Sequence, residues 1–139
     1  RLYASDNKFY FNAIDCCDAN TCYAVGEGDE ESGSNEPGTR IFIINDGQTV
    51  KQVYYNQLDS SSLMTVHCIS DKEAYAGGGD ITGGREFGGT FLHTIDGGET
   101  WTNASVKAPV MWMDMSDDNL YGVASGISKT SGGVEYSYQ

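Results

Sequence analysis

The chain carries the pentapeptide Ala74-Tyr75-Ala76-Gly77-Gly78, and two similar segments surround a tyrosine in the same way. These segments are Cys22-Tyr23-Ala24-Val25-Gly26 and Leu120-Tyr121-Gly122-Val123-Ala124, and a short apolar segment precedes each of the three. Self-similarity at a period of about 20 to 50 residues is typical of repeat architectures. The sequence therefore predicts a unit that occurs three times along the chain.

The composition of each unit indicates strands. Val, Ile, Tyr, Phe and Thr gather in short runs that are bounded by Gly, Asp, Asn or Ser, as is typical of β-strands. Asp46-Gly47 and Asp96-Gly97 stand between such runs, and they favour hairpin turns because both residue types tolerate a positive φ. No long stretch has the apolar spacing of an amphipathic helix, so we expect little helix. We expect the glycines at 77–79 and 83–84 to lie in loops.

Four strands in each unit, at this period, predict an all-β fold: a segment of a β-propeller with about three four-stranded antiparallel blades. The segment is one domain over residues 1–139, with repeats at about 9–56, 61–105 and 108–139. Residues 1–8 would fit the outer strand of a preceding blade. Propellers have about four to eight blades, so we expect further chain or partner subunits to complete the ring. Two copies of three blades would give six. A two-sheet sandwich is the alternative fold.

One turn resembles a known family motif. Residues 94–101 read Thr-Ile-Asp-Gly-Gly-Glu-Thr-Trp, which resembles the Asp box, the hairpin of sialidase-like propeller repeats. In such a turn the Asp carboxylate accepts hydrogen bonds from turn N–H groups and the glycine adopts a left-handed conformation. The segment from Ile14 to Gly26 is also similar to repeats of secreted Asp-box propellers and of photosystem II assembly-factor propellers. The residues that match the Asp box are Thr94, Asp96, Gly98, Thr100 and Trp101.

The resemblance implies a fold and says little about function, because the Asp box is structural. Residues 45–50 and 130–136 look like diverged copies of it, with Val50 and Tyr136 at the Trp position. Sialidases bind a carboxylate with three arginines. The arginines of this chain are Arg1, Arg40 and Arg85, and none has the family's sequence setting, so sialidase activity is not expected.

The best catalytic or metal-binding candidates are Asp15, His67 and Asp114, which stand at equivalent repeat positions near the ends of the predicted inner strands. The simpler interpretation is that a polar residue stands wherever such a strand reaches water. Asp15 and Asp114 would be the acids of a glycoside hydrolase, but the separation of their carboxylates decides that chemistry and the sequence does not give it. We therefore expect a protein that is not an enzyme and that needs no cofactor.

Four cysteines allow three complete pairings. Cys16 and Cys68 occupy equivalent repeat positions. We favour Cys16–Cys22 across a strand turn and Cys17–Cys68 between blades. The alternatives exchange Cys16 with Cys17, or leave the thiols free or bound to zinc. The tripeptide Asn103-Ala104-Ser105 is a glycosylation sequon. An even cysteine count and a sequon together indicate a secreted or extracellular protein.

The charge narrows the partners. Twenty Asp and Glu against eight Lys and Arg give a net charge of -12, which argues against a nucleic-acid binder. No apolar run approaches the ~18 residues of a membrane span. The acidic run at 27–36 has oxygen ligands that suit calcium, but it lacks EF-hand spacing and is better explained as solvated surface. Several aromatic residues, if exposed, would offer faces for sugars: Tyr54, Tyr55, Trp112, Tyr136 and Tyr138.

These features lead to one expectation and two alternatives. We expect a non-catalytic extracellular propeller module that recognises a protein or a glycan and is completed by additional blades. The alternatives are a glycoside hydrolase-type fragment that uses Asp15 and Asp114, and a propeller similar to photosystem assembly factors. The sequence does not identify the ligand or the number of blades in the ring.

Overall fold

The computed structural model describes residues 9–28, 38–57, 61–80, 88–116, 122–130 and 133–138. Within these ranges the chain forms strands and turns and contains no helix, so the expected all-β class is confirmed. Residues 1–8, a predicted outer strand, and Tyr121 lie outside the described ranges. The strands are β1 (Tyr10–Cys16), β2 (Thr21–Gly28), β3 (Gly38–Asn45), β4 (Thr49–Asn56), β5 (Ser62–Cys68), β6 (Ala74–Gly79), β7 (Gly89–Thr94), β8 (Thr102–Val106), β9 (Val110–Met115), β10 (Gly122–Thr130) and β11 (Gly133–Tyr138).

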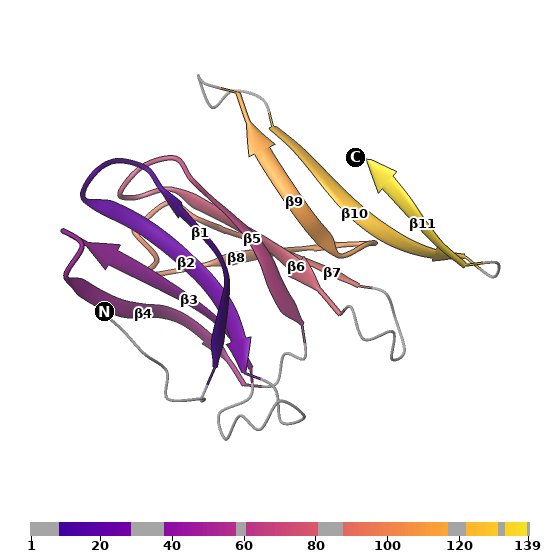
Figure 1. Ribbon diagram of the computed structural model, residues 1–139, viewed down its shortest axis with the longest axis horizontal. Coiled ribbons are helices and arrows are strands. Elements are labelled where there is room, and N and C mark those ends of the chain that lie inside the picture. Colours follow the sequence, from indigo (N-terminus) through magenta and orange to yellow (C-terminus); the bar gives the residue numbers. More distant parts are fainter. Residues whose placement is uncertain are drawn as a thin grey trace.

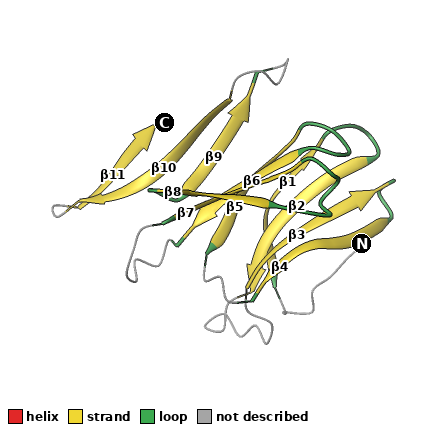
Figure 2. Cartoon of the chain, turned by 180° about the vertical axis from the view of Figure 1, so that it is seen from behind, coloured by secondary structure: helices red, strands yellow, loops and turns green. Residues whose placement is uncertain are grey.

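The strands form three antiparallel sheets in chain order. The first sheet is β1-β2-β3-β4, the second is β5-β6-β7-β8 and the third is β9-β10-β11. The sheets follow one another across the molecule, and the third lies at the opposite end from the first (Figures 1 and 2). β5 packs against β1 and β2, and β9 packs in the same way against β5 and β6. Each sheet therefore meets the preceding one mainly through its own first strand.

A β-bulge recurs where the first and second strands of each sheet pair. On the first strands, the register shifts between Phe11 and Ala13, between Leu63 and Thr65, and between Val110 and Trp112. A glycine stands opposite the start of every bulge, because a Cβ at that position would meet the carbonyl oxygen at the start of the first strand. The glycines are Gly26, Gly78 and Gly126, and the carbonyl groups belong to Tyr10, Ser62 and Pro109.

The bulge glycine corrects the predicted alignment of the third unit. Tyr23 pairs with Asp15 and Tyr75 pairs with His67, but the residue that pairs with Asp114 is Val123. The alignment through Tyr121 was therefore wrong by two positions. The steric requirement for glycine at the bulge sets the register. The residue three positions before that glycine is tyrosine in the first two sheets and Val123 in the third.

The expectation that residues 77–79 form a loop was also wrong, since they continue β6. Gly77 lies against β9, and a Cβ there would approach the side chains of Val110 and Met113 to less than 3 Å. Glycine at this position therefore lets the third sheet pack closely on the second.

The best-defined core lies between the first and second sheets. Tyr23, Val25 and Ile41 of the first sheet are fully buried, as is Leu63 of the second. Burying each side chain of this size stabilises the fold by about 1.5 to 3 kcal/mol. The Tyr23 hydroxyl lies 3.4 Å from the backbone oxygen of Asp71. Burial, together with the nearby carboxylates of Asp71 and Asp96, raises the pKa of Tyr23 to about 12.

Two disulfides join the cysteines in the set favoured from the sequence. Cys16–Cys22 connects paired residues at the end of β1 and the start of β2. Cys17–Cys68 connects the turn after β1 to the end of β5. The first bond lies within one sheet, and the second fastens the first sheet to the second.

Candidate functional site

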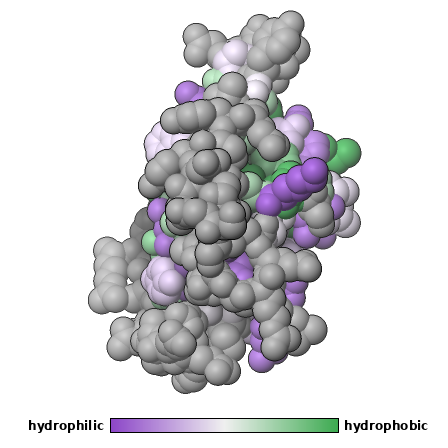
Figure 3. Space-filling model, turned by 90° about the vertical axis from the view of Figure 1, so that its right-hand side faces the viewer, coloured by the Kyte–Doolittle hydropathy of each residue, from purple (hydrophilic) through white to green (hydrophobic). Residues whose placement is uncertain are grey.

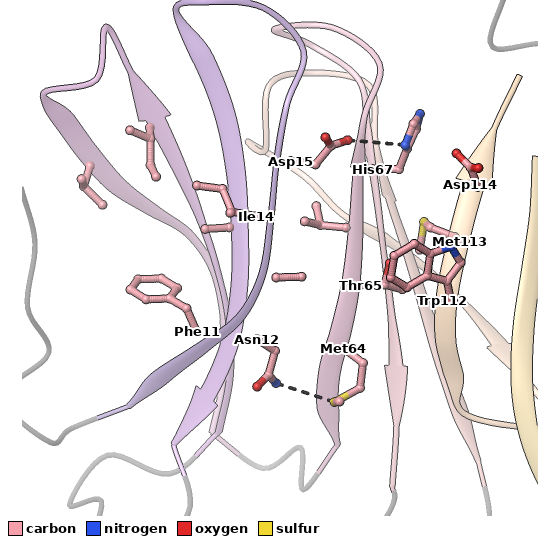
Figure 4. A pocket seen from close by; sticks show the side chains of 15 residues that line it. Phe11, Asn12, Ile14, Asp15, Met64, Thr65, His67, Trp112, Met113 and Asp114 are labelled. Carbon is pink, nitrogen blue, oxygen red and sulfur yellow. Dashed lines mark hydrogen bonds and ion pairs between the residues drawn. The ribbon is translucent and has the colours of Figure 1, made fainter. Parts of the chain in front are cut away.

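An open pocket of about 800 Å³ lies where the first strands of the three sheets approach one another (Figure 4). Its polar side is formed by residues near the carboxyl ends of β1, β5 and β9: Asp15, His67 and Asp114. Its apolar side lies on the first sheet and includes Phe11, Ile14, Ile44 and Val50. The three candidates from equivalent repeat positions therefore all line the same pocket.

Asp15 ties the first sheet to the second. Its Oδ1 accepts a hydrogen bond from the N–H of Cys16 at 3.0 Å, and its Oδ2 accepts one from the N–H of Cys68 at 2.8 Å. The same Oδ2 lies 3.4 Å from His67 Nδ1, and the two side chains point toward each other (Figure 4). Oδ1 therefore bonds within β1, and Oδ2 holds the ends of β1 and β5 together.

Asp114 repeats part of this arrangement on the third sheet. Its Oδ1 accepts a hydrogen bond from the N–H of Met115 at 3.0 Å, as Asp15 does from the next residue of β1. Asp114 is exposed and lies on the side of His67 away from Asp15 (Figure 4). The recurring bond fits the simpler interpretation, in which a polar residue stands where the strand reaches water.

Asn12 is a contact residue that the sequence did not single out. Its side-chain nitrogen donates to the carbonyl oxygen of Leu63 at 2.8 Å and to Glu27 Oε2 at 2.5 Å, and lies 3.7 Å from the sulfur of Met64. Asn12 is the extra residue of the first bulge, so its side chain reaches across to the second sheet. The glycine that marks each bulge is the signal that could have identified it.

The contact with Asn12 also corrects the interpretation of the acidic run. Glu27, its first residue, is buried in β2 and is not part of a solvated surface. Residues 29–36 lie outside the described ranges. Among the residues that are described, no cluster of His, Cys, Asp or Glu is arranged to hold a metal ion, and the four cysteines are all in disulfides.

Exposed apolar side chains stand beside the polar groups of the pocket. The side chains of Trp112 on β9 and Ile14 on β1 are both mostly exposed. Seen from the side on which the third sheet lies, hydrophobic and strongly hydrophilic surfaces adjoin each other (Figure 3). A ligand in this pocket would meet a broad apolar surface edged by carboxylates.

The turn at residues 95–100 is held by hydrogen bonds to the side chains of Asp96 and Thr94. Asp96 Oδ1 accepts from the N–H of Thr100 at 2.9 Å, and Asp96 Oδ2 accepts from the Thr100 hydroxyl at 2.5 Å. The N–H of Gly98 donates to Thr94 Oγ1 at 2.9 Å, and Gly97 and Gly98 have φ of 75° and 83°. Hydrogen bonds from the hydroxyl and the N–H of Thr100 lower the pKa of Asp96 to about 2.

Trp101 fixes this turn to the first sheet. Its ring meets Tyr23 and Tyr54 edge to face, with centroids 6.2 and 6.4 Å apart. The residue at its position in the first sheet is Val50, which lines the pocket. The turn before Val50 is a plain hairpin in which Asp46 and Gly47 have φ of 53° and 59°. The third copy of the motif extends into residues that are not described.

The remaining candidates lie away from the pocket. Arg40 is buried with its guanidinium over the rings of Phe9 and Tyr55, 4.8 and 4.7 Å from their centroids. Asn103 is exposed on β8. Arg1 and Arg85 fall outside the described ranges. Within those ranges, no helix is long and apolar enough to cross a membrane.

Comparison with known proteins does not assign the chain to a family. No protein-family model matches it, and no significant match was found among curated proteins or solved structures. We therefore base the functional proposal on the geometry of the pocket and the sheets.

Proposed function

We propose that the chain is a segment of a β-propeller, with each sheet as one blade, that serves as a non-catalytic extracellular module for recognising a protein or a glycan. The carrying observation is the convergence of Asp15, His67 and Asp114, from equivalent positions of three sheets, on one open pocket. The common bulge and the repeated packing of first strands on the preceding sheet support the blade interpretation.

The bonding of the pocket favours recognition over catalysis. A general acid or base must be able to exchange a proton with its substrate. Asp15 instead accepts two backbone N–H groups and contacts His67, so its carboxylate serves to join two sheets. The polar side of the pocket holds the first and second sheets together, and the surface that it turns toward the pocket is open to a ligand.

Trp112 and Asp114 are the proposed ligand contacts. The Trp112 ring is 67% exposed, and an exposed aromatic ring offers a large apolar face to the face of a sugar or to an apolar side chain of a protein. Asp114 Oδ2 is available as an acceptor for hydroxyl or amide groups of the ligand, because the bond from Met115 uses Oδ1. The two disulfides and the exposed sequon at Asn103 support an extracellular location.

A glycoside hydrolase is the second candidate, because Asp15 and Asp114 line the same pocket. Glycosidases place two carboxyl groups on either side of the scissile bond. On this reading Asp114, which is the more exposed of the two, would be the residue that exchanges protons.

The two candidates are separated by assaying binding and turnover on the same glycans and polysaccharides. Recognition predicts binding without turnover, loss of binding in Trp112→Ala, and unchanged binding in Ile95→Ala, which removes an exposed apolar residue of the Asp-box turn. Hydrolysis by the wild type that Asp114→Asn abolishes would overturn the proposal and establish the hydrolase. Binding of basic and neutral peptides to the same variants tests whether the ligand is a protein.

A further inference from the structure

The two disulfides lie next to each other in the chain but differ in their exposure. Cys16 is exposed and its partner Cys22 is half-buried. Cys68 is only 7% exposed, and its partner Cys17 packs against the core between the first and second sheets. Thiol–disulfide exchange requires a thiolate to reach one of the two sulfurs, so an exposed disulfide is the more easily reduced. The bond within the first sheet is therefore the accessible one.

The turn that the exposed disulfide spans has hydrogen bonds of its own. The N–H of Cys17 donates to the carbonyl oxygen of Thr21 at 3.0 Å. Asp18 Oδ1 accepts from the N–H groups of Asn20 and Thr21 at 2.6 and 2.8 Å. The second disulfide continues to join the first sheet to the second when the exposed one is open. We therefore expect the chain to stay folded with two thiols at this corner.

The exposed disulfide also adjoins the polar side of the pocket. Cys16 directly follows Asp15, and the N–H of Cys16 donates to Asp15 Oδ1 at 3.0 Å. Asp15 Oδ2 accepts from the N–H of Cys68 and lies 3.4 Å from His67 Nδ1 (Figure 4). The Asp15 carboxylate thus bonds a residue of the exposed disulfide through one oxygen and faces the imidazole with the other. A shift of the backbone at Cys16 changes the position of the carboxylate against His67.

We propose that Cys16–Cys22 is a site of thiol–disulfide exchange with an external dithiol, and that its redox state sets the contact between Asp15 and His67. One thiolate of the dithiol attacks the sulfur of Cys16, the more exposed of the two. A mixed disulfide forms, and Cys22 leaves as a thiolate that takes up a proton. The second thiol of the reagent then loses its proton and attacks the reagent's own sulfur in the mixed disulfide, which releases Cys16 as a thiol. The protein disulfide gains two electrons, and the dithiol is oxidised to a cyclic disulfide.

Timed reduction of the oxidised 139-residue chain with dithiothreitol tests the exchange site. Free thiols are alkylated with iodoacetamide at each time, and the labelled peptides are identified by mass spectrometry. Cys16 and Cys22 should be labelled about 10-fold or more faster than the other two cysteines, because their disulfide is the accessible one. The buried disulfide is the internal control. Circular dichroism should show that the form with two thiols is folded.

The chain contains two histidines, and their ring signals in NMR spectra test the effect on the pocket. Reduction of Cys16–Cys22 should shift the ring signals of His67, because Asp15 contacts both sites. The signals of His93 should stay in place, since its Nε2 contacts Glu73 Oε1 instead. Asp15→Ala should remove the response of His67 without changing the order in which the two disulfides are reduced.

The results for the wild type decide the proposal even if Asp15→Ala does not fold. Equal rates of reduction for the two disulfides, or earlier reduction of Cys17–Cys68, would overturn the exchange site. A chain that unfolds when Cys16–Cys22 opens would overturn it as well. Unchanged His67 signals would overturn the link to the pocket, as would equal shifts at both histidines, which indicate a change of the whole fold. Binding of glycans or peptides by Trp112→Ala concerns the proposed function alone.

Discussion

The first and second sheets have the same strand order, the same bulge and the same facing glycine, yet they differ in burial and in one turn. Leu63 of the second sheet is fully buried, whereas Phe11 at the same position of the first is partly exposed. Residues 95–100 form a turn in which the Asp96 carboxylate accepts hydrogen bonds from Thr100, whereas residues 45–48 form a plain hairpin. Backbone sterics at the bulge thus determine the register that the two sheets share. Contact with a neighbouring sheet determines which copy buries its apolar residue at the bulge and which copy has the hydrogen-bonded turn.

The largest expected difference concerns the two disulfides. Removing Cys17–Cys68 as Cys17→Ala with Cys68→Ala should lower the free energy of unfolding by about 4 kcal/mol, because the bond closes a long loop between two sheets. Removing Cys16–Cys22 in the same way should cost only about 2 kcal/mol, since that loop is short. Urea unfolding of both double variants measures the difference. Equal losses would contradict the role of Cys17–Cys68 as the bond between sheets.

The next difference concerns the burial of apolar residues on the first strands of the two sheets. Leu63→Ala should lower the free energy of unfolding by about 3 kcal/mol, because it leaves a cavity between two sheets. Ile14→Ala should cost about 0.5 kcal/mol or less, because the side chain is mostly exposed. Thermal or urea unfolding measures the free energy of unfolding of both variants. A large loss for Ile14→Ala would show that this side chain packs against another part of the molecule.

The smallest difference concerns the two turns and appears in acid. The pKa of Asp96 is lowered to about 2 in the folded chain, so its ionised form stabilises the fold above the ordinary pKa near 4 and this contribution is lost as the pH falls toward 2. Asp96→Asn should be less stable than the wild type at pH 6, and the gap should narrow by pH 2. Thr100→Ala should retain part of the effect, because the N–H of residue 100 remains a donor. A gap that is constant with pH would contradict the hydrogen-bonded carboxylate.

Much of the local structure could be predicted from the sequence, because it depends on local chemistry. Asp46-Gly47 favours a hairpin whose two central residues have positive φ, and that hairpin is present. The sequence favoured the observed cysteine pairs but left open the set in which Cys16 and Cys17 are exchanged. The placement of Asp15, His67 and Asp114 followed from their equivalent repeat positions, since residues at one repeat position lie at one end of neighbouring sheets.

The rest could not be predicted, because it depends on contacts between sheets. The bulge requires glycine at position 126. The third unit was instead aligned through Tyr121, which resembles the tyrosines of the first two units, and this alignment was wrong. Gly77 looks like a loop residue until β9 is placed against it. Glu27 is buried and bonds Asn12, the extra residue of the bulge, and no spacing along the chain shows that contact.

The measurement that tests the repeated packing most directly is a nuclear Overhauser experiment on the labelled 139-residue chain. Contacts should be seen between the Hα protons of Gly77 and the methyl groups of Val110 and Met113, because a Cβ on Gly77 would overlap both side chains. Their presence would show that the third sheet lies on the second as the second lies on the first. If those protons instead contact solvent or a different strand, the three sheets are not copies of one stacked unit.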